Sequence, residues 1–226
     1  MEFEITSYCF ATKGKLLRSL DIKHFSMEHI AHLSKDKKLR EIISLQDPYV
    51  LVKGKNIYLN LCKSIVSQQL STRVADVIYN RFLDVYKNRK PSAQQILDTS
   101  IEKLRSVGLS NAKANYLHNV CRFFIEEKLT DARLHKMTDE EVIEKLTQIK
   151  GVGKWTVEMI LMFTLGREDV FAMDDLIIQQ HFARLYQLDM TDKKAFRIKM
   201  LAQSIKWSPY RTYACRYLWG WKDNGK

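Results

Sequence analysis

Glycine and proline are scarce in this sequence, with 8 and 3 residues in a chain of 226. Proteins built from β-strands need many tight turns, and these two residue types dominate such turns. Their scarcity therefore argues against an all-β fold. It favours a helical protein, in which fewer and longer elements need fewer connections.

Metal-binding patterns are missing as well. The four cysteines lie far apart in the chain: Cys9, Cys62, Cys121 and Cys215. They form no C-x-x-C pair, and histidines such as His29 and His32 have no third ligand nearby, so we expect neither zinc nor an iron–sulfur cluster. We interpret all six histidines as surface residues. Scattered thiols are typical of a reducing compartment.

Long apolar runs are also absent. The longest run, over residues 157–165, is far shorter than the roughly 18 residues that a membrane span requires. The first residues, Met1-Glu2-Phe3-Glu4, lack the basic and apolar regions of a secretory signal. We therefore expect a cytoplasmic protein without a membrane partner.

Positive charge is what this sequence has in excess, with a net charge of +11 and a pI of about 9.4. A basic protein of this size often binds nucleic acid or an anionic membrane. The alternative is a basic soluble protein that binds neither. Charge alone does not decide between them.

Apolar residues recur at helical spacing through most of the chain from Ser26 onward. Two helices are expected within residues 57–85, and a further amphipathic helix over 110–124. The first 25 residues carry weaker signals. A short strand is expected there, on three apolar residues: Phe3, Ile5 and Tyr8.

Several helix starts have capping residues. Ser71 and Ser100 precede helical patterns and are predicted N-caps. Thr138 and Glu141 have the spacing of a capping box, in which each side chain bonds the backbone N–H of the other residue. We therefore expect a helix to begin directly after Thr138.

That helix leads into the most informative segment, which covers residues 146–159. One helix ends, a four-residue Gly-x-Gly turn with Gly151 and Gly153 follows, and a second helix begins. Both glycines are expected to allow positive φ. The free N–H groups at the start of the second helix form an anion site, and Lys154 adds charge there. A DNA phosphate would fit, although a plain tight connection between two helices explains the same pattern.

Four further stretches carry specific patterns. In chain order they are Ile65-Val-Ser-Gln-Gln-Leu-Ser71, Leu104-x-x-x-Gly-Leu-Ser-x-x-Lys-Ala-x-Tyr-Leu117, Val170-Phe-Ala-Met-Asp-Asp-Leu176 and Trp207-x-Pro-Tyr-Arg-Thr-x-Ala-x-x-Tyr-Leu-Trp219. With the hairpin, they span about residues 57 to 221. Five ordered motifs are far more specific than any one of them.

Through these motifs the chain resembles the DNA glycosylase superfamily named for its helix-hairpin-helix and Gly-Pro-Asp motifs, and within it the 3-methyladenine DNA glycosylase II branch. The resemblance implies an all-α fold with two helical lobes and an active-site cleft between them, over residues 1–226. The middle lobe would comprise 57–170 and end in the hairpin, at about 141–165. Residues 1–56 and 171–226 would form the second lobe.

Asp175 matches the catalytic carboxylate of this family. By position alone, an Asp before the apolar run 176–178 is an N-cap, and the two roles are compatible because a helix N-terminus stabilises negative charge. Breaking an N-glycosidic bond builds positive charge on the sugar, which a carboxylate stabilises. We interpret the neighbouring Asp174 as structural, either as a cap or as a partner of Arg184 or another basic residue.

Three residues match the substrate pocket of the family. Trp155 stands where lyase-type members carry a lysine that forms a Schiff base, which a tryptophan cannot do. The resemblance therefore implies a monofunctional enzyme. Trp155 and Trp219 would form aromatic pocket walls that attract cationic bases, and Met159 stands where relatives often have an aromatic residue. The alternative is that both tryptophans are core residues.

Gln69 matches the residue that enters the gap left by a flipped base. The alternative is that Gln68 and Gln69 are capping or surface amides. Further DNA contacts are assigned by the resemblance to the hairpin: Gly151, Gly153, Lys154 and Thr156. The expected partner is double-stranded DNA with a damaged base, contacted by a monomer associated with the nucleoid or the nucleus.

No cofactor is required for this chemistry. By resemblance, the backbone carbonyls of Thr147, Ile149 and Val152 would hold a structural Na⁺ or K⁺ in the hairpin. The implied activity is excision of alkylated purines of the 3-methyladenine and 7-methylguanine type. Two alternatives remain open, namely a glycosylase for uracil, hypoxanthine or an oxidised purine, and a non-catalytic DNA-binding module.

Overall fold

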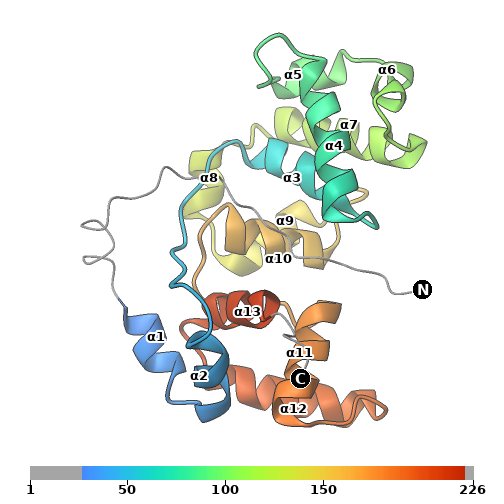
Figure 1. Ribbon diagram of the computed structural model, residues 1–226. Coiled ribbons are helices and arrows are strands. Elements are labelled where there is room, and N and C mark those ends of the chain that lie inside the picture. The colour runs from blue at the N-terminus through green and yellow to red at the C-terminus, as the bar shows by residue number, and fades with distance from the viewer. Residues whose placement is uncertain (1–26, 222–226) are drawn as a thin grey trace. The chain divides into compact units, whose positions relative to one another are not determined.

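The computed structural model describes residues 27–221. Within this range the chain forms helices and connecting segments only (Figure 1), so the predicted all-α fold is confirmed. The strand expected at Phe3, Ile5 and Tyr8 lies outside the described residues. In chain order the helices are α1 (Glu28–Leu33), α2 (Lys37–Ile43), α3 (Ile57–Ser67), α4 (Thr72–Asp84), α5 (Ala93–Leu97), α6 (Ile101–Ser106), α7 (Asn111–Glu126), α8 (Asp131–Lys136), α9 (Asp139–Leu146), α10 (Lys154–Phe163), α11 (Leu176–Tyr186), α12 (Lys193–Ile205) and α13 (Arg211–Gly220).

Local capping explains where several of these helices begin. Thr138 and Glu141 form the predicted capping box at the start of α9. Ser100 accepts a hydrogen bond from the backbone N–H of Lys103 at 3.2 Å, as expected of an N-cap. Ser71 precedes α4 as predicted, but its side chain makes no capping hydrogen bond. The start of α4 was therefore predicted correctly, but the capping hydrogen bond expected from Ser71 is not formed.

The described helices group into two compact units. The first comprises residues 53–166 and contains α3 to α10. The second joins two distant parts of the chain, residues 27–52 with α1 and α2, and residues from 167 onward with α11, α12 and α13. None of the described helices is both long and apolar enough to span a lipid bilayer.

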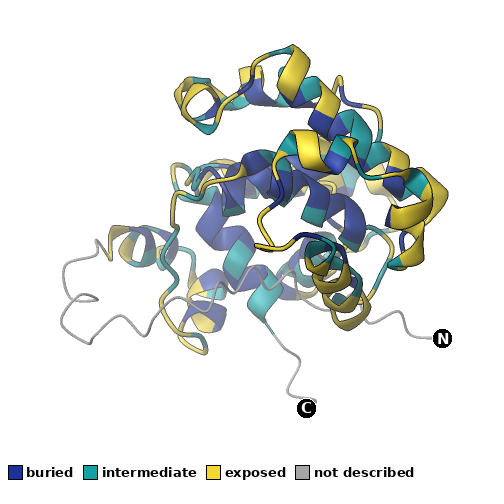
Figure 2. Ribbon diagram, turned by 90° about the horizontal axis from the view of Figure 1, so that it is seen from above, coloured by how far each residue is buried: buried dark blue, intermediate teal, exposed yellow. Residues whose placement is uncertain are grey.

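Helix α3 forms the centre of the first unit, where it packs against α4, α7 and α10. Its residues Ile57, Leu61 and Ile65 have no exposed surface. Helix α10 is buried from residue 156 to 162, and such buried stretches are dark blue in Figure 2. The second helix of the predicted hairpin is therefore anchored in the core, and its N-terminal end is exposed at Lys154.

In the second unit, α11 packs against α13 and α2. The aromatic rings of Phe182 and Trp207 meet edge to face at 5.8 Å in its core. His29 of α1 was predicted at the surface, and that prediction is wrong. The ring of His29 is buried and stacks on Tyr213 of α13 with 4.0 Å between the ring centroids.

Candidate active site

Asp175 is the N-cap of α11. Its Oδ1 accepts a hydrogen bond of 2.9 Å from the backbone N–H of Ile178, and the residue is only 8% exposed. The helix N-terminus offers partial positive charge to this carboxylate, which stabilises its ionised form. Asp175 thus combines a capping bond with the environment that a stabilising anion needs.

A second donor reaches the same oxygen from another helix. The indole Nε1–H of Trp219, on α13, donates to Oδ1 of Asp175 at 2.9 Å. Sequence reasoning assigned Trp219 to a pocket wall through its ring face and missed this bond. No local signal could have shown it, because 44 residues separate the partners.

The loop that precedes Asp175 is fastened to the start of α13. Arg211 donates from Nε to Oδ1 of Asp169 at 2.7 Å and from Nη2 to Oδ2 at 2.9 Å. The backbone N–H of Val170 donates to the Thr212 hydroxyl at 3.0 Å. Bidentate pairs of this kind fix orientation as well as distance. The chain segment that carries Asp175 is therefore held in place by α13.

Asp174 contacts a basic residue, as one form of the sequence prediction had it, but that residue is Arg197 and not Arg184. Its Oδ1 lies 2.5 Å from Nη1 of Arg197 on α12, and both side chains are half exposed. Arg184 lies instead over the ring of Trp221, at 5.0 Å. The pair with Arg197 gives Asp174 a structural contact of its own, distinct from that of Asp175.

The hairpin of the first unit runs from α9 to α10 through residues 147–153, so the connection is longer than the predicted four-residue turn. Gly151 has φ = +103°, and a Cβ atom there would clash with the ring of Tyr116. Gly153 was expected to share the positive φ and does not. Gly153 is the N-cap of α10, and N-cap residues typically have extended backbone dihedrals; its φ is −93°.

Gly153 contributes open space instead of an unusual conformation. A Cβ atom built on it would meet no atom within 4 Å. The residue is exposed and stands directly before the first turn of α10, whose N–H groups have no acceptor within the helix itself. Lys154 is the first residue of that helix. Its Nζ lies 3.7 Å from Oε1 of Glu158, and its side chain is largely exposed. The arrangement leaves room for an anionic group at the helix end.

Gln68 ties the end of α3 to this hairpin. Its Nε2 donates to the carbonyl of Gly151 at 3.3 Å and lies 3.4 Å from the Thr156 hydroxyl. Thr156 was predicted to contact DNA, but the residue is only 2% exposed. Its side chain therefore has an internal role, and the residue offers almost no surface for a contact with DNA.

Gln69, the predicted wedge, is exposed and has φ = +58°. A non-glycine residue in this left-handed region costs about 1–3 kcal/mol, and such strain often marks functional positions. Its neighbour Gln68 is the C-cap of α3 and points to the hairpin. The two amides thus differ in environment, because Gln68 bonds to the hairpin and Gln69 is exposed.

The predicted pocket residues of α10 differ in exposure. Trp155 is partly exposed, whereas Met159, one turn later, has no exposed surface. Full burial is typical of a core side chain, and Met159 therefore contributes packing where a pocket wall was predicted. Trp155 keeps surface that a ligand could contact.

The carbonyls predicted to hold a cation lie in the same connection. The Ile149 carbonyl accepts a hydrogen bond from the N–H of Val152 at 2.9 Å and has a second lone pair left, and the bound cation stays a prediction. The carbonyls of Lys150 and Gly151 are bonded by Asn119 and Gln68. Among the described residues, His, Cys, Asp and Glu side chains form no group of three that could hold a metal ion.

Comparison with known proteins links these features to one superfamily. Residues 62–205 match the model of the HhH-GPD superfamily base excision DNA repair proteins. DNA-3-methyladenine glycosylase 1 of Schizosaccharomyces pombe is 34% identical over 194 residues, which is 84% of each chain. A putative DNA-3-methyladenine glycosylase of Bacillus subtilis is 36% identical over 75% of this chain and 60% of its own length.

Solved structures agree with the sequence matches. The S. pombe 3-methyladenine DNA glycosylase, in complex with abasic DNA, has a TM-score of 0.75 and covers 85% of this chain and 95% of its own. A DNA-3-methyladenine glycosidase of Bacillus halodurans reaches 0.73 at 34% identity, over 86% of this chain and 88% of its own. The resemblance inferred from the five motifs is thereby confirmed. This chain belongs to the HhH-GPD superfamily of base excision DNA repair proteins.

Proposed function

We propose that this chain is a monofunctional DNA-3-methyladenine glycosylase that excises alkylated purines from duplex DNA, with Asp175 as its catalytic carboxylate. The observation that carries the proposal is the environment of Asp175. This carboxylate is nearly buried at a helix N-terminus and receives two hydrogen bonds on Oδ1. A cap alone needs only the bond from Ile178.

The chemistry requires one such group. As the bond between C1′ and the purine nitrogen breaks, the bonding electrons leave with the base and positive charge develops on the sugar. A carboxylate beside C1′ stabilises that charge and accepts a proton from the attacking water. The products are a free base and an abasic sugar with a hydroxyl group at C1′.

Alkylated purines suit a site with a single carboxylate. Other glycosidases use a second carboxyl group as an acid that assists the leaving group. A purine alkylated on a ring nitrogen is already cationic and leaves as a neutral base, so it needs no acid. The partly exposed ring of Trp155 supports this substrate class, because an electron-rich ring face attracts a cationic base.

Monofunctional action follows from the same residue. Lyase-type chemistry requires an amine that attacks C1′ and forms a Schiff base, and the indole of Trp155 cannot do this. Borohydride treatment during the reaction should therefore trap no covalent complex with DNA. A trapped complex at the yield of a lyase-type glycosylase would contradict this part of the proposal.

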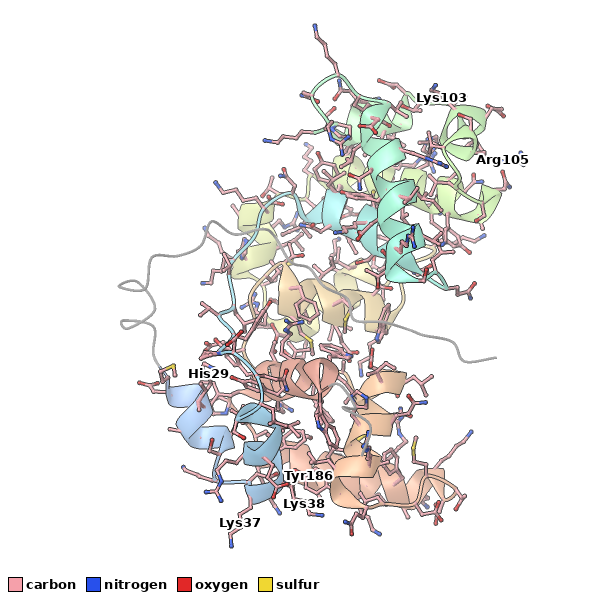
Figure 3. All side chains as sticks on the ribbon, in the orientation of Figure 1. His29, Lys37, Lys38, Lys103, Arg105 and Tyr186 are labelled. Atoms are coloured by element: carbon pink, nitrogen blue, oxygen red, sulfur yellow. The ribbon has the colours of Figure 1, made fainter. Side chains whose placement is uncertain are left out.

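DNA would be held through phosphates. The hairpin supports this with the N-terminal end of α10, where the helix dipole favours an anion, and with the open space at Gly153. The net charge of +11 supports it too, with exposed side chains such as Lys103 and Arg105, which extend from α6 in Figure 3. We expect the protein to act as a monomer inside the cell. Its affinity for DNA should fall steeply as the salt concentration rises.

The test is release of free base from duplex DNA treated with a methylating agent. The parent protein should release methylated purine, and Asp175→Asn should lower the single-turnover rate at least about 100-fold while DNA binding persists. Asp174→Asn is the matched control, since it makes the same change one residue away. It should keep a rate close to that of the parent.

Two results would overturn the proposal. If the parent binds DNA tightly and releases no methylated base, another lesion such as uracil, hypoxanthine or an oxidised purine becomes the substrate to test, or the chain is a binding module. If Asp175→Asn and Asp174→Asn slow release equally, Asp175 is not the catalytic carboxylate.

A further inference from the structure

We propose that Trp219 is a positioning residue, whose indole N–H fixes the orientation of the Asp175 carboxylate. The inference rests on the proposed role of Asp175 and goes beyond it, because it assigns to Trp219 a task that its ring face does not perform. The observation is the 2.9 Å contact from Nε1 of Trp219 to Oδ1 of Asp175.

One capping bond does not fix a carboxylate. The bond from the N–H of Ile178 holds Oδ1 at 2.9 Å, but rotation about that contact still changes the tilt of the carboxylate plane. A second donor from another direction removes this freedom. Trp219 supplies it from α13, and the two donors together define where the carboxylate plane lies.

The donor is itself held firmly. His181 of α11 bonds through Nδ1 to the carbonyl of Leu218, the residue before Trp219, at 2.6 Å. This bond connects the helix that Asp175 caps directly to the turn of α13 that carries the indole. At the other end of α13, Arg211 and Asp169 join the helix to the loop before Asp175.

The carboxylate and its donor therefore belong to one closed frame of the second unit. The frame runs from Asp175 along α11 to His181, across to α13 and back through Trp219. A stabilising group must stay aligned while charge develops, because reorientation during the reaction would cost part of the stabilisation. A rigid second donor meets this need, whereas a pocket wall needs only a ring face.

The two roles of Trp219 separate by substitution. Trp219→Phe keeps an aromatic face and removes the N–H. If Trp219 positions Asp175, this variant should lower kcat for methylated-base release about 10- to 100-fold, as expected for loss of one hydrogen bond to a charged group, and leave KM nearly unchanged. Trp221→Phe is the matched control two residues along. It keeps an aromatic ring against His181 and should keep a kcat close to that of the parent.

A second variant guards against loss of folding. Replacement of Trp219 by 3-benzothienylalanine puts sulfur in place of the N–H and preserves the shape of the indole. It should reproduce the loss of kcat seen with Trp219→Phe. A kcat within about threefold of the parent in either variant, or a loss carried by KM, would overturn the positioning role and favour the pocket wall.

A spectroscopic arm does not depend on activity. The chain has four tryptophans, so its indole N–H groups give few NMR signals, and Trp219→Phe identifies that of Trp219. This signal should move upfield in Asp175→Asn and stay in place in Asp174→Asn. If the chemical shift of this signal is unchanged in Asp175→Asn, the inference fails even for an active enzyme. If the parent is inactive on methylated DNA but the signal moves, the proposed substrate fails and the positioning bond stands.

Discussion

The ammonium group of Lys113, on α7, lies 2.7 Å from the carbonyl oxygen of Gln68 at the end of α3. The same Nζ donates to the carbonyl of Val66 at 2.8 Å. Carbonyls at a helix C-terminus lack intrahelical partners, and a cation there satisfies them. Lys113 therefore closes α3 just before the strained residue Gln69.

Lys113→Met should destabilise the protein by about 2–4 kcal/mol, because two hydrogen bonds from a charged donor are lost while the carbonyls stay partly buried. Urea unfolding measures the effect. Lys103→Met is the matched control on an exposed position of α6 and should change stability by less than about 0.5 kcal/mol. Equal losses in both variants would show that Lys113 does not support this loop.

Substitution by alanine should have different effects at the two hairpin glycines, lowering stability at Gly151 and DNA affinity at Gly153. Gly151→Ala should cost about 2 kcal/mol or more, because alanine disfavours φ = +103° and its Cβ would clash with Tyr116. Gly153→Ala meets no neighbour and should leave the thermal midpoint nearly unchanged, while the affinity for duplex DNA falls. Calorimetry and a DNA titration measure these effects. Unaltered DNA affinity in Gly153→Ala would contradict phosphate contact at this helix start.

Asp169 should make stability depend on acid pH. Its burial acts to raise its pKa, but the hydrogen bonds from Arg211 and Ser208 outweigh this and hold the pKa of Asp169 below its usual value. A depressed folded-state pKa stabilises the protein above the unfolded pKa of about 3.9, and this contribution disappears as pH falls through the lower folded value.

Asp169→Asn should therefore lower the free energy of unfolding by about 1–3 kcal/mol at pH 7, and the difference from the parent should shrink below about pH 4. Denaturant unfolding over this pH range measures it. Arg211→Met should remove the same pH-dependent part of the free energy of unfolding. The double variant should lose little more stability than either single variant. A constant difference at all pH values would contradict the pair.

Asp36 should contribute more than an ordinary helix cap. It caps α2 through the N–H groups of Lys38 and Leu39, and its Oδ2 also accepts from Tyr186, Gln203 (2.6 Å) and Trp207 (3.1 Å). Lys38 and Tyr186 lie together at this point in Figure 3. The side-chain bonds join α2 to the C-terminal helices of its unit.

Asp36→Ala should cost about 3–5 kcal/mol, because it leaves several buried donors without a partner. Asp192→Ala is the matched control. Asp192 caps α12 by accepting from the N–H of Ala195, so its loss should cost only about 0.5–2 kcal/mol. Chemical unfolding of both variants checks the comparison, and equal costs would reduce Asp36 to a cap.

The sequence by itself determined the features that depend on neighbours a few residues apart. The capping box of Thr138 and Glu141 and the cap at Ser100 connect atoms three residues apart, so their spacing in the chain decides the contact. The helical composition and the order of the five motifs are also properties of the chain alone. They were enough to predict the all-α fold and the superfamily.

Only the tertiary structure decided which distant side chains meet. Three contacts join residues far apart in sequence: the bond of Trp219 to Asp175, the pair of Asp174 with Arg197, and the stack of His29 on Tyr213. Helical periodicity indicates which face of a helix is buried but not which neighbour it meets, because that choice depends on how whole helices pack. The sequence was therefore enough to predict Asp175 as the catalytic carboxylate, whereas its bond from Trp219 depends on how α11 and α13 pack together.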